Sequence, residues 1–252
     1  MSQPFNLRGR AMLVTGSTRG IGRALALGLA AQGADVAIHG RRGDGGEEVA
    51  AEARALGARA EVLMADLGDP DACLALAQGA IAAFGAIDGL VLNASMEIRQ
   101  DWMAATPADI DLQLAVNLRS TLLLCQALTP PMMARGWGRV ISIGSIQEVR
   151  PNPACLVYAA SKAAQANVVA NLARQLGPHG VTVNNLAPGA IATDRNAAVL
   201  ADPAYRRKVE DQIPVGRVGD PIDCVGACVL LASEAGGYIN GATLRVDGGW
   251  SL

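Results

Sequence analysis

Short runs of aliphatic and β-branched residues alternate with longer segments of helical periodicity along most of the chain. The runs that predict strands cover residues 11–15, 35–39, 59–64, 88–92, 138–143, 181–186 and 243–246. Helical segments lie next to them, the first two over residues 21–32 and 46–56. Strands and helices that alternate at this spacing form a parallel sheet with helices on both faces. The alternation therefore predicts an α/β fold built on a doubly wound, seven-stranded parallel sheet.

Length alone leaves the number of domains open, because 252 residues are near the upper size for one continuous hydrophobic core. Hydrophobic residues make up 51% of the chain and charged residues 17%, which favours a globular fold over disorder. No linker, low-complexity tract or internal repeat interrupts the alternation, so we expect a single domain over residues 1–252. The longest irregular stretch, residues 187–218, contains Asp202 followed by Pro203 as a helix start, and we expect it to form a substrate lid.

The charge balance and hydropathy argue against nucleic acid and membrane as partners. Lys and Arg total 21 against 23 Asp and Glu, so there is no basic surplus to neutralise a nucleic-acid backbone. No apolar stretch approaches the roughly 18 residues of a membrane-spanning helix, and the apolar run at 11–14 is too short for a signal peptide. We expect a soluble, cytoplasmic protein. The five cysteines are odd in number and lack Cys-x-x-Cys spacing, so neither a disulfide framework nor a metal site is predicted.

A glycine-rich turn lies directly after the first predicted strand and opens the first helix. Gly16, Gly20 and Gly22 permit a tight turn and let backbone N–H groups and the helix N-terminus approach a pyrophosphate. Their position in a strand–helix–strand unit favours dinucleotide binding over a purely structural turn. The cofactor-binding residues predicted in this turn are Gly16, Ser17, Thr18, Arg19, Gly20, Ile21 and Gly22.

The end of the second predicted strand indicates which dinucleotide is bound. Units that bind NAD carry an acidic residue about 20 residues after the turn, where it holds the ribose 2′-hydroxyl. Here the strand ends in His39, Gly40, Arg41 and Arg42. Arg41 and Arg42 can instead hold a 2′-phosphate through charge-assisted hydrogen bonds, with Arg19 as a further cation. We therefore predict NADP as the cofactor, with NAD as the alternative.

Tyr158 and Lys162 are four residues apart and so share one face of a predicted helix. The other tyrosines, Tyr205 and Tyr238, have no lysine at that spacing. Ser145 follows the fifth predicted strand, at the carboxyl edge of the sheet where ligands bind in such folds. A tyrosine with an ordinary pKa of about 10 is a poor base at neutral pH, but a nearby ammonium group and an oxidised nicotinamide ring stabilise the phenolate. The pattern predicts general acid–base catalysis matched to hydride transfer.

Taken together, these motifs resemble those of the classical short-chain dehydrogenase/reductases, which have a Rossmann-type fold. The motifs that carry the resemblance are Thr-Gly-x-x-x-Gly-Ile-Gly at 15–22, Asp66, Asn93-Ala94-Ser95, Asn117, Ser145, Tyr158, Lys162 and the Pro188-Gly189 segment ending in Thr193. The resemblance implies that Tyr158 is the general acid/base and that Ser145 hydrogen-bonds the substrate oxygen. It also implies that Lys162 binds the nicotinamide ribose and lowers the pKa of Tyr158, while Asn117 supports a water in the proton relay.

The same resemblance implies further cofactor contacts, from Asp66 to the adenine and from Ile191 and Thr193 to the carboxamide. The full set predicted beyond the glycine turn is Arg41, Arg42, Asp66, Leu67, Asn93, Tyr158, Lys162, Pro188, Gly189, Ile191 and Thr193. Ser95 departs from the family pattern, which commonly has glycine there. Its side chain is added where the backbone approaches the cofactor ribose, which would weaken cofactor binding, but the catalytic residues are untouched. We interpret Ser95 as tolerated variation. The family also implies a homotetramer.

Polar residues near the predicted site favour a polyhydroxylated small-molecule substrate over a lipid or steroid, because unpaired buried carboxylates and amides are costly. The predicted substrate contacts are Glu97, Ser145, Gln147, Glu148 and Asn196. A finer resemblance to the glucose 1-dehydrogenase branch of the family implies oxidation of an aldose at its anomeric hydroxyl. It is carried by Ser-x-x-Glu at 145–148, Glu97, Thr193-Asp-Arg-Asn196 and Ala201-Asp-Pro203. A gluconate or keto-sugar reductase and a 3-oxoacyl-[acyl-carrier-protein] reductase remain open. The latter favours a basic surface near the pocket, for which the candidates are Arg99, Arg150, Arg206 and Arg207. A non-catalytic NADP-binding sensor is disfavoured, because the Ser-Tyr-Lys set is complete.

Overall fold

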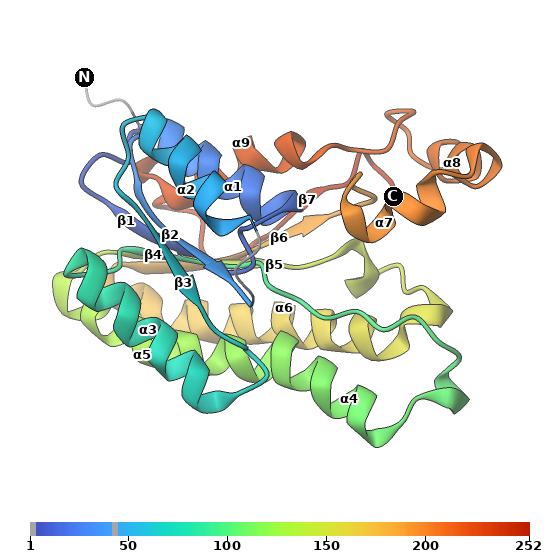
Figure 1. Cartoon of the computed structure of the whole chain (residues 1–252), viewed down its shortest axis with the longest axis horizontal. Coiled ribbons are helices and arrows are strands. Elements are labelled where there is room, and N and C mark those ends of the chain that lie inside the picture. Colours follow the sequence, from blue (N-terminus) through green and yellow to red (C-terminus); the bar gives the residue numbers. More distant parts are fainter. Residues whose placement is uncertain (1–3, 42–44) are drawn as a thin grey trace.

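The computed structural model describes residues 4–41 and 45–252, and these form the predicted α/β sandwich (Figure 1). All seven strands are parallel and lie in the order β3-β2-β1-β4-β5-β6-β7. The strands are β1 (Ala11–Val14), β2 (Asp35–Gly40), β3 (Ala60–Met64), β4 (Gly89–Leu92), β5 (Gly138–Ile143), β6 (Val181–Pro188) and β7 (Thr243–Val246). The strand order reverses between β1 and β4, and open α/β sheets bind ligands at such a point.

Helices cover both faces of the sheet. They are α1 (Gly20–Ala31), α2 (Gly46–Ala55), α3 (Pro70–Phe84), α4 (Pro107–Leu114), α5 (Ser120–Arg135), α6 (Leu156–Leu176), α7 (Asp194–Leu200), α8 (Pro203–Glu210) and α9 (Val225–Ala232). In Figure 1, α1, α2 and α9 lie on one face, and α3, α5 and α6 lie on the other. The doubly wound, seven-stranded prediction is confirmed.

Two aliphatic clusters form the core, one on each face of the sheet. Successive strand side chains point to opposite faces, so Met12 and Val14 of β1 enter one cluster while Leu13 enters the other. Leu25 and Leu29 of α1 join the first cluster, and Leu124 of α5 joins the second. Because both faces are covered, the central strands read as continuous apolar runs rather than as an alternating pattern.

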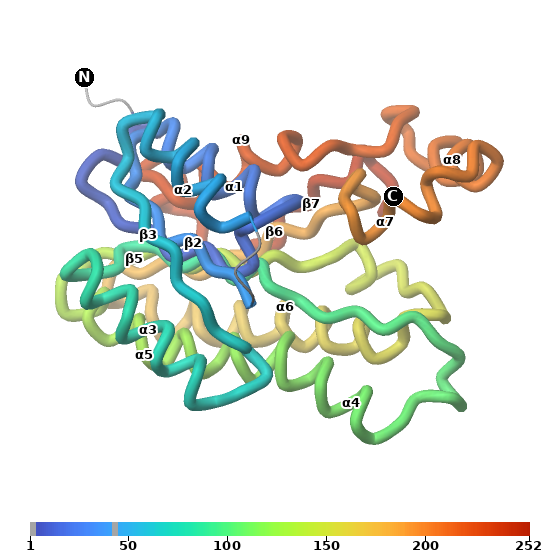
Figure 2. The backbone as a smooth tube through the Cα atoms, viewed as in Figure 1, coloured from blue at the N-terminus to red at the C-terminus, as the bar shows by residue number. Residues whose placement is uncertain are grey.

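The 187–218 segment is more regular than the sequence analysis expects. Strand β6 continues through Pro188, and α8 begins at Pro203 as predicted, with the Asp202 carboxylate accepting a hydrogen bond from Ala204 N at 2.9 Å. Helix α7 precedes it and was not predicted. The chain then returns through β7, and the C-terminus lies beside α7 and α8 (Figure 2). Among the described residues, no helix is both long and apolar enough to cross a membrane.

Candidate active site

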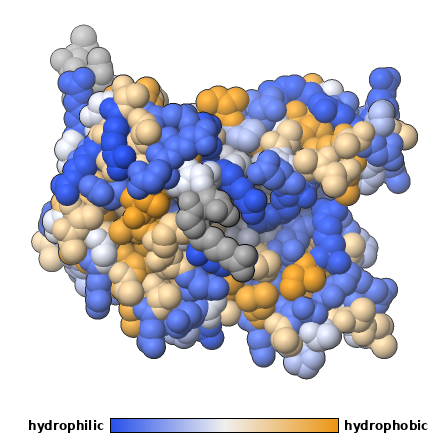
Figure 3. All heavy atoms as spheres, viewed as in Figure 1, coloured by the Kyte–Doolittle hydropathy of each residue, from blue (hydrophilic) through white to orange (hydrophobic). Residues whose placement is uncertain are grey.

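A cleft of about 1030 Å³ opens at the carboxyl edge of the sheet, over the point where the strand order reverses. Figure 3 shows its mouth as a hollow with mostly hydrophilic side chains. The predicted site residues that line it are Gly16, Thr18, Arg19, Gly20, Ile21, Gly22, Arg41, Asp66, Leu67, Asn93, Glu97, Ser145, Gln147, Tyr158, Lys162, Pro188, Gly189, Ile191, Thr193 and Asn196. Ser17, Asn117 and Glu148 are not among the described lining residues, and Arg42 lies outside the described part of the chain.

In the glycine turn, backbone groups lie so close together that side chains would not fit between them. Gly16 and Gly20 have φ values of +62° and +56°, and a Cβ on Gly22 would lie 2.2 Å from the Gly16 carbonyl oxygen. Asn93 holds the turn by donating from Nδ2 to the carbonyl oxygens of Thr15 and Gly16, both at 2.9 Å. No side chain caps the start of α1, and its first turn has no acidic residue. The uncapped N–H groups at the start of α1, together with glycines that carry no side chain, therefore fit a pyrophosphate.

His39 supports this turn, a role that the sequence analysis did not foresee. Its Nδ1 accepts a hydrogen bond from Gly16 N at 2.9 Å, and its Nε2 lies 3.1 Å from the carbonyl oxygen of Ala65. These partners require a neutral ring that is protonated on Nε2. Burial lowers the pKa of His39, which also favours the neutral form. Beyond it, Arg19 and Arg41 both line the cleft and can face a 2′-phosphate.

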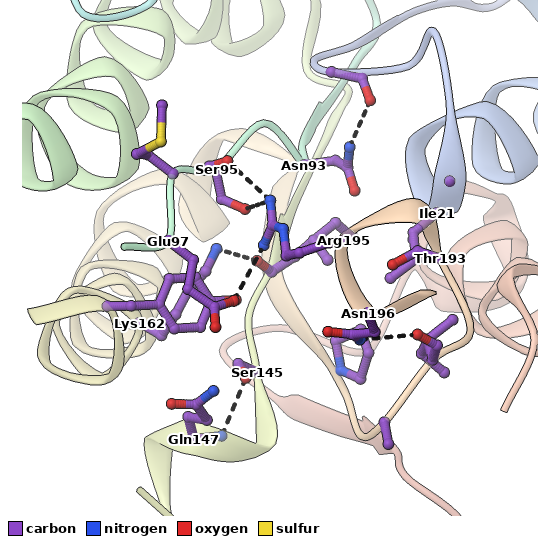
Figure 4. A pocket seen from close by; sticks show the side chains of 18 of the residues that line it. Ile21, Asn93, Ser95, Glu97, Ser145, Gln147, Lys162, Thr193, Arg195 and Asn196 are labelled. Carbon is purple, nitrogen blue, oxygen red and sulfur yellow. Dashed lines mark hydrogen bonds and ion pairs between the residues drawn. The ribbon is translucent and has the colours of Figure 1, made fainter. Parts of the chain in front are cut away.

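Ser145, Tyr158 and Lys162 all line the cleft, and Figure 4 shows Ser145 and Lys162 there. Lys162 is only 1% exposed, donates from Nζ to the Ile143 carbonyl oxygen at 2.7 Å, and lies 5.6 Å from the centroid of the Tyr158 ring. Burial lowers the pKa of Lys162 to about 7 and raises the pKa of Tyr158. The positive charge of Arg195 opposes the rise at Tyr158 and adds to the fall at Lys162, because it favours the phenolate and disfavours a second cation.

Glu148, which is predicted as a substrate contact, is engaged within the protein. Its carboxylate accepts hydrogen bonds from Ser145 N at 2.9 Å and from Asn185 Nδ2 at 3.0 Å. A Ser-x-x-Glu spacing is also the spacing of a capping box, in which the glutamate bonds back to the serine's backbone. The spacing thus has a structural use here, and Glu148 holds the turn that presents the Ser145 hydroxyl.

Asn117 also acts through the protein rather than from the cleft wall. It lies in a π-helical turn, Ala115–Arg119, between α4 and α5. Its Nδ2 donates to Met96 O and Ser161 Oγ, both at 2.9 Å, while its Oδ1 accepts from Met96 N at 2.7 Å. These bonds tie the loop after β4 to α6, the helix that carries Tyr158.

The substrate end of the cleft contains a charged cluster that bridges two loops. Glu97 accepts hydrogen bonds from Arg99 Nε at 2.8 Å and from Cys155 Sγ at 3.1 Å. Arg195, from α7, donates to the carbonyl oxygen and hydroxyl of Ser95 (Figure 4). Because of these contacts, the pKa of Glu97 stays below its usual value although burial would raise it. Sequence reasoning named Arg99 only as part of a basic surface near the pocket, and it assigned no role to Arg195, which lies inside the Thr193–Asn196 motif.

Comparison with known proteins gives a consistent result across the whole chain. The family model described as enoyl-(acyl carrier protein) reductase matches residues 16–251. A gluconate 5-dehydrogenase of Gluconobacter oxydans is 35% identical over 99% of this chain and 98% of its own length.

Two solved structures are similar in fold and sequence. One is a 3-oxoacyl (acyl-carrier-protein) reductase of Agrobacterium tumefaciens with NADP bound, which is 45% identical, covers 98% of this chain and 96% of its own, and has a TM-score of 0.94. The other is a gluconate 5-dehydrogenase of Burkholderia cenocepacia in complex with NADP and tartrate. It is 36% identical, covers 98% of this chain and 97% of its own, and has a TM-score of 0.93.

Proposed function

We propose that this chain, which belongs to the short-chain dehydrogenase/reductase family, is an NADP-dependent dehydrogenase of polyhydroxylated carboxylic acids of the gluconate class. The protein is an oxidoreductase that acts on CH–OH groups. Of the substrates that the sequence left open, we choose the sugar acid over the neutral aldose. A gluconate 5-dehydrogenase among the relatives supports this choice, as does the tartrate, itself a hydroxylated acid, held by a neighbouring structure.

The charge of the substrate end carries the proposal. Apart from Lys162, the basic residues that line it are Arg99, Arg150, Arg195 and Lys208, and the acidic residues are Glu97 and Asp194. The described lining therefore has a positive excess, although the whole chain has a net charge of -2. A cleft lined by one sign of charge raises the local concentration of the opposite ion. A carboxylate gains from this excess and a neutral aldose does not.

In this proposal each residue of the cleft has a separate role in one reaction. NADP⁺, held at the glycine turn with Arg41 near its 2′-phosphate, supplies the hydride acceptor. Ser145 hydrogen-bonds the reacting hydroxyl, and Tyr158 takes its proton in oxidation and returns a proton to the carbonyl in reduction. Lys162 and Arg195 supply positive charge that favours the phenolate. Gln147 and Asn196 line the same end of the cleft and offer amides to the other hydroxyls.

A second candidate is reduction of a 3-oxoacyl chain. It is supported by the 45% identity to a 3-oxoacyl (acyl-carrier-protein) reductase, and the matching family model is also described by an acyl-carrier-protein substrate, although an enoyl one. The same positive excess suits the anionic carrier of such a substrate. Substrate preference therefore separates the two candidates.

The test is to follow NADPH absorbance with the purified protein and a matched panel of substrates. The panel contains gluconate and glucose with NADP⁺, and 5-ketogluconate and a 3-oxoacyl thioester with NADPH. The proposal expects the highest kcat/KM for the acid pair, gluconate or 5-ketogluconate. A higher kcat/KM for glucose or for the thioester contradicts it, and the latter result selects the second candidate.

A further inference from the structure

Arg195 reaches across the cleft from the first turn of α7 to the loop after β4 (Figure 4). One of its terminal nitrogens, Nη2, donates to both the carbonyl oxygen and the hydroxyl of Ser95, at 2.9 and 3.0 Å. Two acceptors on one nitrogen restrict the plane of the guanidinium group. The side chain at position 95, where the family commonly has none, thus supplies one of the two contacts that orient Arg195.

Arg195 lies farther from the Glu97 carboxylate than Arg99 does. Glu97 is 2.8 Å from Arg99 Nε, but its other oxygen is 3.7 Å from Arg195 Nη1, too far for a hydrogen bond. Within the described residues, Arg195 Nε and Nη1 have no hydrogen-bond partner. The Arg195 side chain is 43% exposed while Glu97 is 7% exposed. Arg195 therefore presents unused donors to the cleft.

A third arginine at this end of the cleft, Arg150, is already engaged. Arg150 donates from Nη1 to the Trp250 carbonyl oxygen at 2.8 Å and from Nη2 to Gln212 Oε1 at 2.7 Å. Arg195 also lines the same cleft as Ser145, Tyr158 and Lys162. A ligand whose hydroxyl reaches Tyr158 can thus place a second polar group on Arg195.

We propose that Arg195 binds the carboxylate of the substrate, with Ser95 and Glu97 as the residues that position its guanidinium group. The inference rests on the proposed function, because it assigns a residue to the acid group that distinguishes a sugar acid from a sugar. A guanidinium edge matches a carboxylate with two parallel N–H donors. Arg195 then selects acids over neutral polyols of the same length.

The test compares the Arg195→Gln variant with the wild type on gluconate and on gluconamide, which keeps every hydroxyl but has no charge. We expect Arg195→Gln to lower kcat/KM for gluconate by at least about tenfold, the scale of one lost charge-assisted hydrogen bond. The kcat/KM for gluconamide is expected to fall by a smaller factor, because that substrate loses only the effect of Arg195 on the Tyr158 phenolate. Ser95→Ala, which keeps the carbonyl acceptor, is expected to raise KM for gluconate with little effect on kcat.

Arg207→Gln is the matched control, because Arg207 is an exposed arginine of the neighbouring helix α8 and its side chain is 80% exposed. It should leave the preference of gluconate over gluconamide unchanged. Equal losses for both substrates in Arg195→Gln would show a general role of α7 and overturn the inference, as would no loss for either. If the wild type itself prefers glucose to gluconate, the proposed function fails, and this result is visible before any variant is made.

Discussion

At the scale of single residues, the site is a set of groups whose burial sets their protonation. Tyr158 is 7% exposed, and burial raises the pKa of its phenol, so the free protein holds the proton at neutral pH. Arg195 opposes this shift, and Lys162 is held on a backbone carbonyl. The resemblance implies that Lys162 lowers the pKa of Tyr158, and Arg195 is a further cation that opposes the rise in this structure.

Tyr158→Phe removes the proton-transferring oxygen and keeps the ring. We expect kcat to fall by about 100-fold or more, the usual scale for losing a general acid–base group. NADPH affinity, measured by fluorescence titration, should change little because the glycine turn and Lys162 are intact. Turnover equal to that of the wild type would contradict the assignment of Tyr158.

The pH profile of the wild type gives an independent measure of the same group. Because oxidation needs the phenolate and burial raises the pKa of Tyr158, the rate of oxidation should increase as pH rises from neutral. Reduction needs the protonated phenol and should lose activity as pH rises through that pKa. The residual activity of Tyr158→Phe should lack both dependences on pH. An oxidation rate that falls with rising pH, or a reduction rate that increases, would contradict the mechanism.

At the scale of elements, the short turn after β5 connects stability to catalysis. Glu148 accepts from Ser145 N and from Asn185 of β6, so it joins the turn to the sheet. We expect Glu148→Ala to cost about 1–3 kcal/mol of stability, since it leaves buried donors unpaired. It should also lower kcat/KM for gluconate and gluconamide by the same factor.

Glu148→Gln is the control, because the amide oxygen can still accept one of these bonds. Its unfolding free energy, measured by denaturant titration, should lie between the wild type and Glu148→Ala. A loss in Glu148→Ala confined to one of the two substrates would restore the direct substrate contact that the sequence analysis predicts.

The elements that could be predicted are those whose signal is local. Strand β5 has its predicted bounds, since an apolar run followed by a polar turn defines both of its ends. Helix α7 was not predicted, because it has only seven residues and none of them is buried. The positions of Arg195 and Trp250 in the cleft depend on contacts between distant segments, so no periodicity or spacing could reveal them.

At the scale of the whole molecule, one cleft draws on both halves of the chain. The turn after β1 and the loop after β4 are joined where Thr15 Oγ1 accepts from Asn93 N and Ala94 N, at 2.9 and 3.0 Å. The Ser-Tyr-Lys set comes from the turn after β5 and from α6, and Arg195 comes from α7. The spacing of motifs identified the first two groups because a parallel sheet brings the ends of its strands to one edge.

A ligand that occupies this cleft stabilises the entire fold, because it binds the native state and not the unfolded chain. Thermal unfolding therefore measures cofactor preference without any substrate. NADP should raise the melting temperature of the wild type more than an equal concentration of NAD does. Arg41→Ala should reduce the NADP shift and leave the NAD shift almost unchanged, because Arg41 is predicted to contact only the 2′-phosphate. Arg54→Ala, which removes an arginine of α2 that pairs with Glu47, should reduce neither shift. Equal reductions of both shifts in Arg41→Ala would mean that Arg41 supports the cleft as a whole, and the preference for NADP would then rest on another group.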